Sequence, residues 1–184
     1  MKIMIFKTVV FVYLPDDVHA VPAGTLTLNQ VGNEISSKFV YGSRYTKRTN
    51  AIELDPVSLQ FKAIFRRLDE EIVPRNNLHL FGAFRDATPD SWGRRVIEKQ
   101  FHATQLPEIE YIKHSFDDRV GALDFRDTPT SEARKFPFNR VLNLSYILDC
   151  ANKIDHDEPV PDDVLRMFNF GSSMGGARPK AVVE

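Results

Sequence analysis

The chain is poor in cysteine and in long apolar runs, and its charges nearly cancel. Cys150 is the only cysteine, so no internal disulfide forms, as is typical of proteins from a reducing compartment. No stretch approaches the roughly 20 apolar residues of a membrane-spanning helix. With 24 basic and 25 acidic residues, the chain lacks the basic excess that favours nucleic acid as the main ligand. The sequence therefore predicts a cytoplasmic protein with no membrane segment and no direct DNA binding.

Metal chemistry also has little support in the sequence. The five histidines form no i, i+4 pair and have no cysteine near them, so no zinc site is expected. Asp117 and Asp118 are a pair of carboxylates that would suit a cation. A solvated turn before a strand is the interpretation that we favour for this pair. We therefore assign no metal ligand and no catalytic residue.

The first 41 residues have the pattern of three short strands. Residues 6–14 are rich in β-branched and aromatic side chains, residues 25–28 alternate between polar and apolar, and residues 35–41 form a third run. Turns are expected at residues 15–17, 22–24 and 29–33. Short strands joined by tight turns predict an antiparallel meander.

Helical patterns dominate the rest of the chain. The clearest helix is expected to begin near Pro89 with Thr88 as its cap, and a short helix is expected over residues 61–68. Asn143 would cap another, and Pro161 would open a short last helix. The helix after Asn143 places Cys150 in an apolar pattern, where core packing is expected, and its apolar face would comprise Leu144, Ile147, Leu148, Ala151 and Ile154.

Together these patterns predict an α+β fold in two parts. A boundary is expected between Ala103 and Pro107, so that residues 1–103 hold the meander with helices. Residues 107–184 would then hold a strand at 120–125, helices, a glycine-rich loop and the start of a further strand at 181–184. No internal repeat is present.

The glycine-rich loop at residues 171–180 (GSSMGGARPK) is the main chemical signal. Glycines let several backbone N–H groups approach one anion, and Arg178 and Lys180 add positive charge. The spacing fits neither a Walker A loop nor a dinucleotide fingerprint. From the residues alone, phosphate binding and a plain flexible turn remain equally open.

A second motif, residues 81–95, has acids and arginines close together in the order FGAFRDATPDSWGRR. One hypothesis is an acid–base pair formed by Asp86 and Asp90. The interpretation that we favour is helix capping and arginine–carboxylate pairing. A third motif, residues 117–123 (DDRVGAL), is expected at the start of a strand.

These motifs, in this order, resemble the HipA family of bacterial serine/threonine kinase toxins. Residues 23–26 and 39–41 look like its N-terminal domain, residues 81–86 and 89–94 are similar to its most specific signature, and residues 119–123 resemble the start of its kinase lobe. Residues 173–180 look like its phosphate-covering loop. The resemblance implies that an N-terminal subdomain leads into a kinase-like N-lobe.

The resemblance also implies site residues, cofactors and partners. ATP, with Mg in the full-length kinase, would be contacted by Gly175, Gly176, Ala177, Arg178, Pro179 and Lys180. Ser173 would be the autophosphorylated serine, although the residues alone favour a turn-stabilising role for its hydroxyl. The implied partners are a DNA-binding antitoxin of the HipB type and an aminoacyl-tRNA synthetase as substrate.

A kinase also needs a strand lysine and acids that lie beyond this loop in the family. None can be assigned to residues 1–184. We therefore expect the N-terminal part of a HipA-like kinase that binds no nucleotide strongly and transfers no phosphate by itself. The alternatives are a stand-alone binding module that inhibits a partner HipA-like kinase, and the product of a degraded gene.

Overall fold

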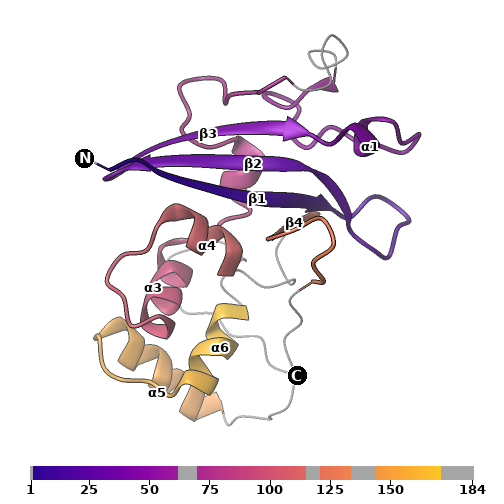
Figure 1. Ribbon diagram of the computed structural model, residues 1–184. Helices are drawn as coiled ribbons and strands as arrows, with labels where there is room; N and C mark the ends of the chain where they lie inside the picture. Colours follow the sequence, from indigo (N-terminus) through magenta and orange to yellow (C-terminus); the bar gives the residue numbers. More distant parts are fainter. Residues whose placement is uncertain (1, 62–69, 115–120, 134–143, 171–184) are drawn as a thin grey trace. The chain divides into compact units, whose positions relative to one another are not determined.

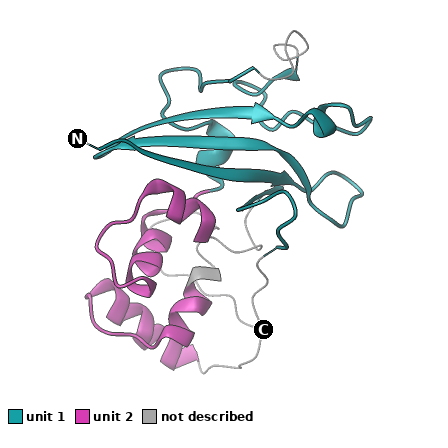
Figure 2. Cartoon of the chain, in the orientation of Figure 1, with its two compact units in different colours: residues 1–87, 121–133 teal, residues 88–120, 134–184 magenta. Residues whose placement is uncertain are grey.

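The computed structural model describes residues 2–61, 70–114, 121–133 and 144–170, and it has an α+β fold as predicted (Figure 1). The chain forms two compact units (Figure 2). Unit 1 comprises Met1–Ala87 and Gly121–Ala133, and unit 2 comprises Thr88–Val120 and Arg134–Glu184. Within the described ranges, no helix has both the length and the apolar character needed to cross a membrane.

Unit 1 is built on one antiparallel sheet. Its strands are β1 (Met4–Val12), β2 (Val21–Val31), β3 (Glu34–Tyr41) and β4 (Leu123–Arg126), in the spatial order β3-β2-β1-β4. The predicted meander is confirmed. A two-residue turn joins β2 to β3, and its first residue, Gly32, has a φ of 59°, which glycine adopts without strain. The strand expected at residues 120–125 is β4, which pairs with β1 of the meander.

The turn expected at residues 22–24 is wrong, because these residues lie inside β2. Pro22 pairs with Phe11 and Gly24 pairs with Val10, with a shift in register between these two pairs. On its other edge β2 pairs with β3 through Gly24 and Tyr41. Partner strands on both sides outweigh the local preference of proline and glycine for a turn.

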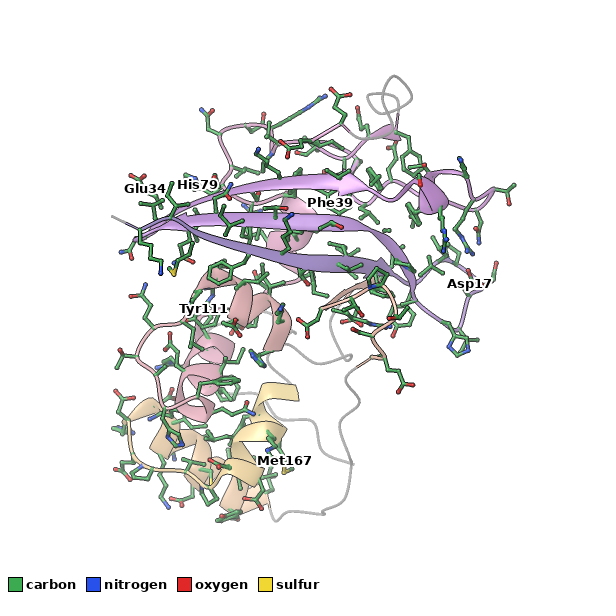
Figure 3. The ribbon with its side chains drawn as sticks, viewed as in Figure 1. Asp17, Glu34, Phe39, His79, Tyr111 and Met167 are labelled. Atoms are coloured by element: carbon green, nitrogen blue, oxygen red, sulfur yellow. The ribbon has the colours of Figure 1, made fainter. Side chains whose placement is uncertain are left out.

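Gly24 is required because the ring of Phe39 occupies the space beside it. A Cβ atom on Gly24 would lie 2.3 Å from the carbonyl oxygen of Val40 and 2.5 Å from Cζ of Phe39. Phe39 is fully buried on β3 (Figure 3). Its ring contacts the ring of Tyr41 on the same strand at a centroid distance of 4.9 Å. Phe39 and Tyr41 are both part of the buried core of unit 1.

Two short helices, α1 (Ser43–Thr46) and α2 (Gly82–Asp86), complete the regular structure described in unit 1. Unit 2 contains four helices in its described residues: α3 (Ser91–Gln100), α4 (Glu108–His114), α5 (Leu144–Asp155) and α6 (Asp162–Phe170). The core that joins α3, α5 and α6 comprises Trp92, Val96, Ile147, Cys150, Ala151, Ile154, Val164, Leu165 and Phe168. The predicted core position of Cys150 is confirmed.

Several helix predictions need correction. Leu144 and Leu148 do not belong to the buried face of α5, since they are 64% and 58% exposed. The buried stripe of α5 runs through Ile147, Cys150 and Ile154 because these residues meet the core with α3 and α6. Asn143, the helix expected at residues 61–68 beyond its first residue, and the strand expected at residues 181–184 lie outside the described residues.

The boundary expected between Ala103 and Pro107 stays a prediction. The helices on either side of it, α3 and α4, belong to the same compact unit. Arg94 of α3 and Glu108 of α4 form an ion pair across it at 2.5 Å.

We predict that Gly24→Ala destabilises the protein by about 1–3 kcal/mol, because the added methyl group overpacks the contact with Phe39. Gly42→Ala is the matched control. A Cβ atom there would meet its nearest atom, the carbonyl oxygen of Ala23, at an ordinary 3.5 Å, and the backbone is extended. Chemical denaturation measures both free energies of unfolding. Equal losses in the two variants would contradict this account of Gly24.

Candidate functional site

The loop residues predicted to bind ATP, Gly175, Gly176, Ala177, Arg178, Pro179 and Lys180, lie outside the described residues, as does Ser173. The described chain ends with α6 at Phe170, directly before this loop. Residues 171–175 also fit the pattern Gly-x-Ser-x-Gly. A hydrolase elbow with this pattern follows a strand, whereas here a helix precedes it.

The site described by the structure is therefore built on the second motif, residues 81–95. Its first half forms α2 in unit 1, where Phe81 and Phe84 are fully buried. Their spacing of three residues puts both rings on one face of a helical turn. The Phe84 ring lies 5.3 Å from that of Phe39 and 5.7 Å from that of Phe125, in edge-to-face geometry. The motif thus attaches α2 to strands β3 and β4.

Asp55 fixes the position of α2 and was missed by sequence reasoning. Its side chain is buried, and Oδ1 accepts hydrogen bonds from the backbone N–H groups of Val57 (2.7 Å) and Ser58 (3.0 Å). Oδ2 accepts one from the N–H of Ala83 at the start of α2, at 3.4 Å. The dipeptide Asp55-Pro56 was a signal for this turn, because an aspartate before proline often starts one.

Two stacked tyrosines hold the segment around Asp55. The Tyr41 hydroxyl accepts a hydrogen bond from the N–H of Leu54 at 3.0 Å and donates one to the carbonyl of Leu59 at 2.8 Å. The Tyr45 hydroxyl donates to the carbonyl of Ile52 at 2.7 Å. Burial raises the pKa of both hydroxyls, so they stay protonated and keep donating.

The hypothesis of an acid–base pair has no support in the surroundings of Asp86 and Asp90. Asp86 is exposed and lies 3.5 Å from the guanidinium of Arg85. Asp90 is the N-cap of α3, because its Oδ1 accepts a hydrogen bond from the N–H of Gly93 at 2.8 Å. The capping prediction was right in kind but wrong in residue, since Asp90 and not Thr88 is the cap. The helix begins at Ser91.

Arg94 joins α3 to α4 by the arginine–carboxylate pairing expected for this motif. Its Nη1 and Nη2 donate to the two carboxylate oxygens of Glu108 at 2.7 and 2.5 Å. The guanidinium also lies over the Tyr111 ring, 4.4 Å from its centroid. The hydrogen bonds to Glu108 raise the pKa of Arg94. The Tyr111 hydroxyl donates to Glu98, so the network returns to α3.

Trp92 is the residue of this motif that packs in the core of unit 2. It is fully buried, and its ring meets that of Phe168 on α6 edge to face at 5.3 Å. Its indole N–H is buried without an acceptor, as far as the described residues show. Over the same residues, no group of three histidine, cysteine, aspartate or glutamate side chains is placed to hold a metal ion. Asp117 and Asp118 lie outside them.

A comparison of the sequence with models of protein families gives a match. The model of the HipA N-terminal domain matches residues 17–126, which is more than half of the chain. The match includes β2, β3, the whole of residues 81–95, α4 and β4. Comparison with curated proteins and with solved structures gave no match.

We predict that Asp90→Ala lowers the free energy of unfolding by about 1 kcal/mol, because α3 loses its N-cap hydrogen bond. Asp86→Ala is the control from the same motif. Its side chain is exposed, so removing its ion pair changes the free energy of unfolding by less than about 0.5 kcal/mol. Thermal or chemical denaturation separates the two. A larger loss for Asp86→Ala would contradict the capping role of Asp90.

Arg94→Lys is expected to cost about 1–2 kcal/mol, since an ammonium group cannot form both hydrogen bonds to Glu108. The control is Arg95→Lys. Arg95 forms a more exposed ion pair with Asp155 at 3.0 Å, and its replacement should cost less than about 0.5 kcal/mol. Adding Glu108→Gln to each variant tests the pairing. Glu108→Gln should lower the free energy of unfolding little further once Arg94→Lys is present. If the two losses add in full, Arg94 and Glu108 do not form the proposed pair.

Proposed function

The chain belongs to the HipA N-terminal domain family, and we propose from this that it is the N-terminal part of a HipA-like protein serine/threonine kinase, the toxin of a toxin–antitoxin pair. The observation that carries the proposal is the family match over residues 17–126. The glycine-rich loop at residues 171–180 supports it, because a kinase of this kind holds the phosphates of ATP under such a loop.

The chemistry of the loop residues fits a phosphate group. Gly175 and Gly176 have no side chains to keep their N–H groups away from an anion, and Arg178 and Lys180 supply positive charge. In the proposed kinase these residues bind and orient the phosphates of ATP, which supplies the transferred phosphoryl group together with Mg. The strand lysine and the acids that complete phosphoryl transfer are not assigned to any residue here.

The helices of unit 2 support this role by fixing the segment that precedes the loop. Val164, Leu165 and Phe168 of α6 are buried in the core that includes Trp92 of the signature. The described part of α6 reaches Phe170, and the loop starts at the next residue. The proposed partners are an antitoxin of the HipB type and, as the substrate of the full-length kinase, an aminoacyl-tRNA synthetase, all within the cytoplasm.

The family match ends at residue 126, before the glycine-rich loop, so it is equally compatible with a second candidate function. In it the chain is a separate module that binds and inhibits a partner HipA-like kinase. The two functions differ in one measurable property: the kinase binds ATP through residues 175–180, whereas an inhibitory module acts by binding the partner protein.

Replacement of Ser173 by aspartate should weaken ATP binding by about tenfold or more, because the carboxylate lies in the loop and repels the nucleotide's phosphates. Ser172→Asp is the matched control and should have a smaller effect, and Lys180→Ala should also weaken binding. Calorimetric titration of the protein encoded by the complete reading frame with MgATP measures these affinities.

Mass spectrometry of the same protein, expressed where ATP is available, should find phosphate on Ser173. Phosphate on Ser172 alone would contradict the assignment of Ser173. Absence of ATP binding in the unchanged protein would contradict the kinase proposal and leave the inhibitory module.

A further inference from the structure

Strand β1 has one edge that is paired over only part of its length. On the β2 side, pairing runs from Met4 to Val12. On the β4 side, pairing covers only Val9 to Val12, and no described residue pairs with the backbone from Met4 to Thr8. Figure 1 shows β4 beside one end of β1 only. As far as the described ranges go, the first part of β1 therefore has an open backbone edge.

The end of β4 is fixed by side chains, so β4 does not extend along this edge. The Thr8 hydroxyl donates to the carbonyl of Arg126, the last residue of β4, at 2.9 Å. The chain then turns, with a hydrogen bond from the N–H of Ser131 to the carbonyl of Thr128 at 3.1 Å. Arg126 holds this turn by donating from Nη1 to the carbonyl of Ser131 at 2.9 Å.

The pairing beyond Val9 shows which backbone groups face the open edge. The N–H of Tyr13 donates to the carbonyl of Ala122, which places the hydrogen-bonding groups of odd-numbered residues on the β4 side. Backbone groups alternate between the two edges of a strand. The N–H and C=O groups of Ile5 and Lys7 therefore point to the open edge.

The exposed side chains at the start of β1 and just before it are apolar and basic. Ile3 and Ile5 are 61% and 64% exposed, which is unusual for two isoleucines on one face of a strand. Lys2 and Lys7 are exposed, and neither forms an ion pair within the described part of the chain.

We propose that residues 3–7, at the start of β1, accept a β-strand from a partner protein, one in which apolar residues alternate with polar ones and acidic residues flank them. An exposed sheet edge binds an extended chain through backbone hydrogen bonds, and side-chain pairs set the specificity. Acidic flanks complement Lys2 and Lys7.

A synthetic peptide of alternating valine and threonine, flanked by glutamates, serves as the probe, and a lysine-flanked version is its charge control. The expected result is binding of the acidic peptide together with slower amide hydrogen exchange at Ile5 and Lys7. Lys7→Glu should weaken this binding by about fivefold, corresponding to a cross-strand charge pair of about 1 kcal/mol. Lys47→Glu, an exposed charge reversal on the loop after α1, should leave it unchanged.

Ile5→Pro removes an N–H that faces the open edge while leaving the hydrogen bonds to β2, and it should abolish binding. If this variant loses its folded circular dichroism spectrum, Lys7→Glu decides the question. Equal affinity for the two peptides, unchanged exchange at Ile5 and Lys7, or a dimer of this chain that already protects these amides would overturn the proposal.

Discussion

The contact between Phe39 and Gly24 is the constraint on which unit 1 depends. The Phe39 ring lies where any other residue at position 24 would place its Cβ atom. From there the ring reaches Phe81 at 6.2 Å and Phe84 at 5.3 Å, so the same side chain joins strand β3 to α2. Without space at Gly24, the ring would move and the aromatic contacts of α2 would move with it. One glycine and one phenylalanine thus set the distance between sheet and helix.

Hydrogen bonds of buried polar groups fix the orientation of the elements that this apolar contact brings together. Asp55 accepts from backbone N–H groups of its own turn and of α2, while the Tyr41 hydroxyl is both acceptor and donor for the segment on either side of Asp55. A buried carboxylate or hydroxyl without such partners would cost free energy, so each group is stable in one arrangement only. Rings hold α2 against the sheet, and these hydrogen bonds specify how its first turn lies.

Sequence periodicity predicted the elements of this fold better than their ends and contacts. Alternation over residues 25–28 identified β2, since alternation depends only on which face of a strand is buried, and the run at residues 35–41 identified β3. The turn predicted at residues 22–24 was wrong, because the local turn preference of Pro22 and Gly24 does not take account of partner strands on both sides. Leu144 and Leu148 were wrongly predicted to be buried, because the apolar face of a helix can be wider than the stripe that the core covers. Asp55 and Glu108 needed partners that are distant in sequence, which a pattern of neighbours does not contain.

The described side chains of the motif at residues 81–95 pack in the cores and hold helix ends, so they are not where a reaction is expected to take place. Its first half completes the core of unit 1 through Phe84, and its second half begins the core of unit 2 through Trp92. The acid that starts α3, Asp90, holds a backbone N–H, and the arginine that follows, Arg94, is paired with Glu108. Such groups are poor candidates for proton or phosphoryl transfer, because a change in their charge would disturb the helix that they hold. The described side chains of residues 81–95 therefore serve packing and helix capping in each unit, and none of them is placed for chemistry.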